Sequence, residues 1–448
     1  MSRKPRRRGA SSALAAGAAL NRDGAAAGAY RSTRLDNGIE VVTEAMAGVR
    51  SVATGVWVRQ GAALDPPGMA GASHLLEHVV FRGTERRSRR DIALALESLG
   101  GSLNAYTARE HTGFEARVLG RHLPDAVDVL ADLVRRPLIR EDDVDHEREV
   151  VCEEIAAVED TPDDLVFEMH GDGLWGGHPY GRPILGSRET LAEMSRNDLA
   201  ELHGRTYTGA NLVVAAAGAV EHDEFTELVG RWFGDMEPGE EVEPVDPPPR
   251  PTRGTTTVSR GSAQVHIVLG HPTRGQSHPD RYPLILLSAA LGGGMSSRLF
   301  QRIREELALA YAVYSYQALY RRAGVCGSYL GTRPGCGSAA LDAVREVYGE
   351  LAREGFASGE LRRTKEQVKG EIVLSLESPA ARLHRLAGFA LVGEAFIPVD
   401  ELTRRIDRVS EGDILRVAGE VMDPECQYVL CLGPEDADPA QADGQDWR

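Results

Sequence analysis

The sequence predicts an α+β fold made of two similar halves, which a linker joins so that they can close as a clamshell. The same order of elements occurs twice along the chain: strands, helices, a pair of strands and then further helices. Residues 236–255, which separate the two runs, are acidic and rich in Pro, as in a linker. Each half is therefore expected to hold a mixed or antiparallel sheet covered by helices.

The first half, residues 29–235, is predicted element by element from its apolar pattern. Alternating apolar and polar side chains indicate strands, and apolar residues three or four apart indicate helices. Gly100 and Gly101 close one of these helices. In order, this half is expected to hold strands within 38–60, a helix at the histidine motif described below, a helix near 89–99, strands over 102–107 and 112–119, helices to about 208, a buried strand over 211–217 and a helix to about 233.

The second half, residues 256–435, repeats this plan. The Gly-rich stretch that starts at Leu291 lacks the spacing of a phosphate-binding loop and has no nearby lysine, so it is interpreted as a tight connection between helices. The corresponding place in this half carries no histidine motif. The expected elements are a strand near 264–269, helices from 280 and from 297, strands near 311–316 and 325–330, and then long helices.

The two ends of the chain are expected to be disordered tails, at residues 1–28 and 436–448. The first tail is rich in Ala and carries six basic side chains against one acidic side chain. It faintly resembles a signal or transit peptide, but its apolar part is mostly Ala and Gly. Whether it is a targeting segment stays open.

The composition indicates a globular enzyme in a reducing compartment. Hydrophobic residues make up 42% of the 448 residues, yet no run of about twenty is apolar, so no membrane contact is expected. The five cysteines are odd in number and show no Cys-x-x-Cys spacing, which favours free thiols and a bacterial cytoplasmic location, with a mitochondrial matrix as the alternative. The net charge of −16 favours cationic peptides over nucleic acid as partners, or serves solubility alone.

Residues 74–78 read His-Leu-Leu-Glu-His, the strongest functional signal in the chain. On a helix, His74 and His78 project from one face, because residues four apart are neighbours there, and can share a metal ion. Glu77 lies close to the same face, where it can take a proton from water that the metal activates. The order His-x-x-Glu-His is that of the inverted zinc peptidases.

A third metal ligand is expected from the segment near residues 142–159, which has helical spacing. Glu147 and Glu154 lie two turns apart and therefore share a face beside the apolar stripe, whereas Glu153 points about 100° away. Two histidines, one carboxylate and an open fourth position are typical of a catalytic zinc site. The alternative is an ordinary charged surface helix.

The chain resembles the pitrilysin-type zinc metallopeptidases, and specifically the branch that contains the mitochondrial processing peptidase and its bacterial relatives. The resemblance extends over roughly residues 30–435, in the order of the family. The segments that carry it are HLLEHVVFRGT from His74, LNAYTARE from Leu103, EREVVCEEI from Glu147, HPYGRPILG from His178 and SSRLFQRIREELALAYAVYS from Ser296.

This resemblance implies one zinc ion per chain, held by His74, His78 and Glu154. It also implies that Glu77 is the general base and that Glu147 supports the site from behind the ligands. The same resemblance implies that Arg304 and Tyr311 reach the substrate from the second half, and that the chain is a zinc metalloendopeptidase.

Arg304 and Tyr311 also have ordinary interpretations. Arg304 can be a surface residue paired with Glu305 or Glu306, and Tyr311 can be a core aromatic in a strand. The histidines outside the motif are interpreted as structural. This holds for His111, His170, His178 and His203 in particular.

Substrate is expected to add to an edge strand at Asn104, Ala105 and Tyr106 by main-chain hydrogen bonds, which would favour extended, unfolded peptides or presequence-like segments. The alternative is an ordinary strand within the sheet. The resemblance further implies a chamber between the halves, and a homodimer or a heterodimer with a homologous subunit. Two rival functions stay open: a non-catalytic core subunit of a larger complex, and a dedicated maturation protease for one peptide precursor.

Overall fold

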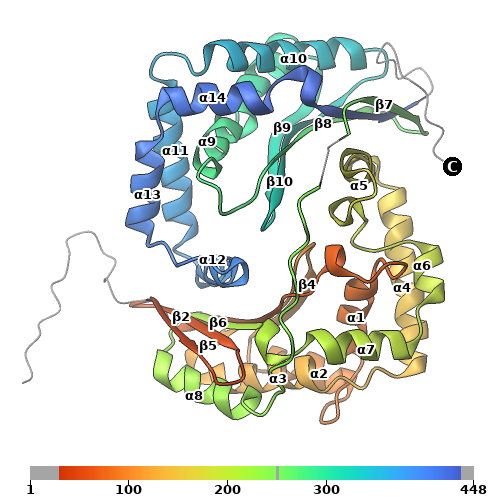
Figure 1. Ribbon diagram of the computed structural model, residues 1–448, viewed down its shortest axis with the longest axis vertical. Helices are drawn as coiled ribbons and strands as arrows, with labels where there is room; N and C mark the ends of the chain where they lie inside the picture. Colours follow the sequence, from red (N-terminus) through yellow and green to blue (C-terminus); the bar gives the residue numbers. More distant parts are fainter. Residues whose placement is uncertain (1–29, 249–251, 435–448) are drawn as a thin grey trace, which may run out of the picture.

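The computed structural model describes residues 30–248 and 252–434. The predicted tails at 1–28 and 436–448 lie outside these residues. Figure 1 shows two α+β halves that face each other, the first coloured red to green and the second teal to blue. This arrangement confirms the predicted two-half clamshell.

The first half contains a six-stranded mixed sheet in the order β1-β2-β6-β3-β5-β4. Neighbouring strands are antiparallel except for β2 and β6, which are parallel. The edge position of β4 leaves one side of its backbone without a partner strand among the described residues. The strands are β1 (Tyr30–Arg34), β2 (Glu40–Ala45), β3 (Ser51–Val58), β4 (Ser102–Thr107), β5 (Thr112–Leu119) and β6 (Leu212–Gly218).

The second half repeats this sheet with five strands in the order β7-β11-β8-β10-β9. Each of its strands corresponds to a strand of the first sheet, with β7 in the place of β2 and β11 in the place of β6. The neighbours β7 and β11 are parallel, as β2 and β6 are in the first sheet. The duplication inferred from the order of elements is therefore a duplication of topology. The strands are β7 (Gly254–Ser259), β8 (Val265–Arg274), β9 (Ala310–Leu319), β10 (Ala323–Thr332) and β11 (Tyr428–Gly433).

Fourteen α-helices cover the two sheets within the described residues, and none of them is both long and apolar enough to cross a membrane. Their bounds are α1 (Ala72–Val80), α2 (Arg89–Glu97), α3 (Leu123–Arg135), α4 (Glu141–Glu159), α5 (Pro162–Trp175), α6 (Arg188–Glu193), α7 (Arg196–Thr206), α8 (His222–Phe233), α9 (Arg281–Gly292), α10 (Gly337–Glu354), α11 (Glu360–Ser375), α12 (Pro379–Val392), α13 (Val399–Arg408) and α14 (Glu411–Val421).

Three strands were not expected from the sequence: β1, β7 and β11. They are short, and β7 begins at Gly254, inside the stretch predicted as linker. The helix expected from residue 297 contains a π-helical segment, Phe300–Glu306. The pair β4 and β5 has the predicted bounds.

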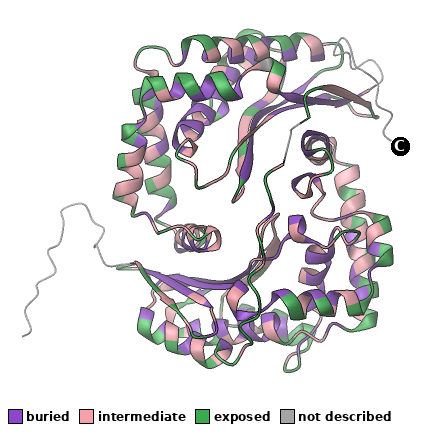
Figure 2. Cartoon of the chain, viewed as in Figure 1, coloured by how far each residue is buried: buried purple, intermediate pink, exposed green. Residues whose placement is uncertain are grey.

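Each half lends one helix to the sheet of the other half. Helix α12 of the second half packs on the first sheet through Leu383 and Leu386, and α5 of the first half packs on the second sheet through Val166 and Leu174. Figure 1 shows both helices lying across from the bulk of their own half. Each sheet therefore has helices on both of its faces, and β6 and β10 are buried along their whole length (Figure 2).

Strand β6 shows how the two faces are shared. Leu212 and Val214 point to the helices of the first half, whereas Val213 and Ala215 point to α12. Successive side chains in a strand point to opposite faces. Because helices cover both faces here, every residue of this strand is buried. Polar contacts add to the docking of α12: Arg382 pairs with Glu44.

Replacing Gly173 with Ala should loosen the docking of α5 on the second sheet. A Cβ atom at this position would overlap the phenol ring of Tyr428 on β11, whose hydroxyl is held by Thr256. Overpacking of this kind destabilises by about 1–3 kcal/mol. Urea denaturation should show the loss. The matched control is Gly204→Ala in α7, where a Cβ has open space and should stabilise by up to about 1 kcal/mol. Equal stabilities of the two variants would contradict the assigned contact.

Candidate metal centre and active site

Helix α1 carries the histidine motif, and a buried aspartate fixes where the helix begins. The N-cap residue Gly71 has φ +93°, a left-handed backbone conformation that residues other than Gly rarely adopt. Since Gly71 has no side chain to cap the helix, Asp65 does so from outside it. One carboxylate oxygen accepts the Gly71 N–H at 2.9 Å, and the other accepts the Ser73 N–H at 3.0 Å. The first turn of α1 is thereby anchored one residue before His74.

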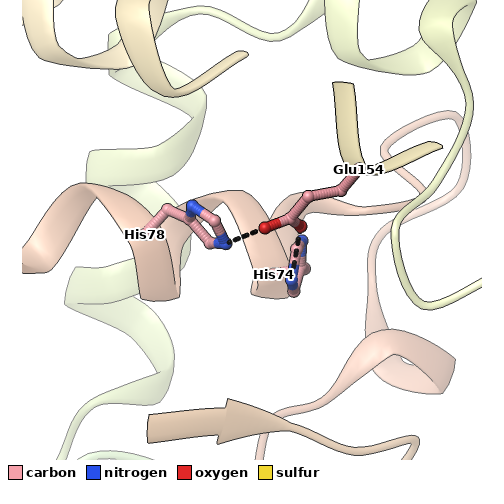
Figure 3. A group of neighbouring side chains, drawn as sticks. All are labelled: His74, His78 and Glu154. Carbon is pink, nitrogen blue, oxygen red and sulfur yellow. Dashed lines mark ion pairs between the residues drawn. The ribbon is translucent and has the colours of Figure 1, made fainter. Parts of the chain in front are cut away.

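The three predicted ligands come together between α1 and α4 (Figure 3). His74 Nε2 lies 3.7 Å from Glu154 Oε2, and His78 Nε2 lies 3.7 Å from Glu154 Oε1. One ligand atom from each of the three residues lies within 4.8 Å of the others. The distances are too long for hydrogen bonds. They are close to the roughly 3.4 Å that separates ligand atoms about 2.1 Å from a tetrahedral zinc ion.

The state of His74 suits a metal ligand. Burial, together with the neighbouring His78, lowers the pKa of His74 to about 4. The imidazole is therefore neutral at pH 7, as metal binding requires. Two imidazole nitrogens and one carboxylate oxygen are a donor set that zinc prefers, and the residues present fit this ion.

Glu147 stands behind His78. Its Oε2 lies 3.0 Å from His78 Nδ1, and its Oε1 lies 3.1 Å from a guanidinium nitrogen of Arg82. Arg82 also contacts Asp143 of α4 at 3.3 Å. A carboxylate that receives the second ring N–H of a histidine fixes its tautomer and leaves Nε2 free to bind metal. Glu153, by contrast, is exposed on α4.

Glu77 lies beside the ligands with its carboxylate held by the edge strand. The Thr107 hydroxyl at the end of β4 donates to Glu77 Oε2 at 2.7 Å. Burial raises the pKa of Glu77, although this hydrogen bond and His78 partly oppose the shift. A raised pKa makes the ionised carboxylate a better proton acceptor near neutral pH.

A cavity of about 300 Å³ joins the metal centre to the edge strand. It is lined by Glu77 and His78 of α1, by Glu147 and by the middle of β4. Asn104 and Ala105 line it directly. Tyr106 does not line this cavity, and its hydroxyl accepts the Trp57 indole N–H at 3.0 Å.

Family models and relatives match nearly the whole chain. The model "Insulinase (Peptidase family M16)" matches residues 40–188, and "Peptidase M16 inactive domain" matches residues 193–368. A protein of Mycobacterium tuberculosis, described as an uncharacterized zinc protease, is 40% identical over 410 residues, which cover 89% of this chain and 92% of that protein. One of Bacillus subtilis with the same description is 37% identical, covering 88% and 96%.

The chain belongs to peptidase family M16. The predicted resemblance to the pitrilysin-type metallopeptidases is thereby confirmed. The crystal structure of a protease from Helicobacter pylori has the same fold, with a TM-score of 0.84 at 21% identity, and the match covers 90% of this chain and 99% of that one. These relatives are bacterial.

The second half of this M16 chain has no counterpart of the histidine motif. Helix α9 occupies the place that α1 has in the first half, and its sequence RYPLILLSAALG contains no histidine. The metal centre therefore belongs to the first half alone, within the described residues. Only the first sheet has both an edge strand and a ligand helix beside it.

Arg304 and Tyr311 lie together in the second half of the M16 fold. The Arg304 guanidinium lies 4.7 Å from the centre of the Tyr311 ring and 3.7 Å from a Glu305 oxygen. Tyr311, at the start of β9, is 76% exposed, so its interpretation as a core aromatic was wrong. No hydrogen bond or ion pair in residues 30–248 and 252–434 joins either residue to His74, His78 or Glu154.

Three residues around the M16 site were not identified from the sequence: Asp65, Arg82 and Thr107. Arg82 and Thr107 act through contacts between segments far apart along the chain, which spacing does not report. Asp65 contacts residues only six and eight positions later, but it does so from outside the helix that it caps. Of the histidines outside the motif, His170 lies buried on α5 with Nε2 3.1 Å from the Tyr428 carbonyl oxygen.

Replacing Glu147 with Gln should weaken zinc binding by about 10–100-fold. The amide cannot supply the negative charge that orients His78 and balances Arg82. Competition with a zinc chelator would measure the affinity, and circular dichroism would show that the fold is kept. Glu149→Gln, an exposed position on the same helix, should leave the affinity unchanged. If the two variants bind zinc equally well, Glu147 does not support the centre.

Proposed function

We propose that this protein is a zinc-dependent endopeptidase that hydrolyses extended, unfolded peptides between its two halves. The observation that carries the proposal is that ligand atoms of His74, His78 and Glu154 lie within 4.8 Å of one another. Glu77 lies on the same helix as the two histidines, and the free edge of β4 lies beside it. The zinc proteases among the relatives support the identity of the metal and the class of reaction.

The residues of the chain divide the work of hydrolysis. When bound by His74, His78 and Glu154, zinc would act as a Lewis acid that polarises the scissile carbonyl and makes water more acidic. Glu77 then accepts the proton of the attacking water and passes it to the leaving amine. The Thr107 hydroxyl keeps the Glu77 carboxylate in place. Arg304 and Tyr311 would contact the substrate once the second half closes on it.

Binding at the edge of β4 would impose little preference for the substrate's side chains at most positions. Main-chain hydrogen bonds to residues 104–106 would read an extended backbone, so that a folded protein is excluded. The chain is acidic overall, with a net charge of −16, which favours basic peptides such as presequence-like segments. A dedicated maturation substrate would show itself as a single cleaved peptide.

We further propose that the chain works in the bacterial cytoplasm as a homodimer that needs no other subunit. Both the metal residues and the Arg304–Tyr311 pair are present in one chain, so that a catalytic partner has nothing to add. Inactive purified protein that regains activity on addition of a homologous subunit would favour the heterodimer instead.

The test is digestion of a mixed pool of basic and acidic unfolded peptides by the zinc-loaded full chain, read by mass spectrometry. Cleavage that stops when zinc is removed with a chelator and returns when zinc is added would establish the activity. Protein purified without zinc that binds none on addition would instead favour a non-catalytic core subunit. The products would show whether basic chains are preferred.

A further inference from the structure

A second cavity, of about 260 Å³, lies where the two halves meet. Its walls come from six segments: residues 59–64 after β3, the β4–β5 turn, the linker, Gln276 after β8, the β9–β10 turn and the end of α12. The cavity is thus formed only when both halves and the linker are in place. It shares no lining residue with the cavity at the metal centre.

Three arginines line this cavity: Arg59, Arg109 and Arg321. The Arg59 side chain is 13% exposed and donates to the carbonyl oxygens of Ala390 and Leu391, at the end of α12. Arg109 donates to the Arg182 carbonyl oxygen at 2.6 Å. The Arg321 guanidinium makes no ion pair or side-chain hydrogen bond with any residue the structure describes.

Acidic groups offset only part of this positive charge. Arg59 pairs with Glu40, which does not line the cavity, at 3.6 Å. Glu110 is the one acidic residue among those that line the cavity, and both of its oxygens are engaged. One accepts the Tyr180 hydroxyl at 2.6 Å, and the other accepts the backbone N–H of Arg321 at 2.8 Å. Burial lowers the pKa of His111 to about 4, so this side chain is uncharged at pH 7.

The rest of the wall is apolar. Leu64, Leu319, Leu391 and Val392 line it beside the arginines. An inorganic anion would leave this apolar surface uncovered, whereas an apolar ligand would leave the guanidinium groups without a counter-charge. The volume is smaller than the 300 Å³ or more of sites for drug-sized ligands, and suits a body of about one amino-acid residue.

We propose that this cavity binds a carboxylate attached to a small apolar body, the chemistry of a peptide's C-terminal residue or of an acylated apolar amino acid. Arg321 pairs with the carboxylate, with Arg59 and Arg109 behind it. Because the walls come from both halves, the bound ligand ties the halves together and raises the thermal stability of the closed arrangement. Binding does not require hydrolysis, so the inference stands apart from the proposed peptidase activity.

The test uses three probes with the full chain, measured by calorimetric titration and thermal unfolding. N-acetyl-leucine has both the carboxylate and the apolar body, N-acetyl-leucinamide has the body alone, and inorganic phosphate has the charge alone. N-acetyl-leucine is expected to bind and to raise the Tm with concentration. The other two probes should bind at least about tenfold more weakly, since each lacks one half of the recognition.

Arg321→Met should weaken the binding of N-acetyl-leucine at least about tenfold. Arg322→Met is the matched control, because Arg322 pairs with Asp246 outside the cavity, at 2.8 Å, and its loss should leave binding unchanged. Binding of the amide as tight as that of the acid, or an equal affinity in both variants, would overturn the proposal. So would the absence of binding by correctly folded wild type, or phosphate binding as tightly as N-acetyl-leucine.

Discussion

Glu77→Gln is expected to lower kcat for an unfolded peptide by about 10²–10⁴-fold, the usual contribution of a positioned general base. The amide has the size of the carboxylate and can still accept the Thr107 hydroxyl, so the local structure should be kept. It has no basicity, however, and cannot take the proton of the attacking water. Because Glu77 is not one of the three metal-binding residues, zinc content should stay at one ion per chain.

Steady-state kinetics would measure kcat, and elemental analysis of the same preparations would measure the zinc content. Glu97→Gln, at the exposed end of α2, is the control and should retain full activity. Thr107→Val tests the supporting contact and should fall between the two. A Glu77→Gln variant with normal kcat would show that another group is the base.

Local patterns were enough to predict which three residues the structure brings within 4.8 Å of one another as possible metal ligands. The four-residue spacing of His74 and His78 places both on one helical face, and the helical period distinguishes Glu154 from Glu153. These inferences need only the geometry of a single helix. Thr107 could not be found in this way, since its contact with Glu77 depends on how α1 packs against β4.

The partners of buried surfaces were equally beyond the sequence. The apolar run of β6 predicts a strand covered on both faces, and it is. Nothing in that run says that the cover on one face is α12, more than 160 residues later. The short strands β7 and β11 were missed for a related reason, because their pairing with each other and with β8 decides their conformation.

Glu154→Gln should weaken zinc binding by more than about 100-fold, beyond the loss expected from a residue that only supports a ligand. In the proposed site this carboxylate would supply the third ligand atom and the only negative charge among the three groups that could hold the metal. A neutral amide oxygen is a poor substitute, and two imidazoles alone hold zinc weakly. Chelator competition would measure the affinity, and peptide hydrolysis should be lost in parallel.

Glu153→Gln gives this expectation its sharpest control. The two residues are adjacent on α4, so both substitutions remove one negative charge from nearly the same place in the same helix. Glu154 faces His74 and His78, whereas Glu153 is exposed on the other side. Normal zinc affinity in Glu153→Gln with a large loss in Glu154→Gln would therefore assign the third ligand to one carboxylate. The reverse result would mean that α4 is rotated about its axis by about 100° from the orientation that directs Glu154 to the histidines.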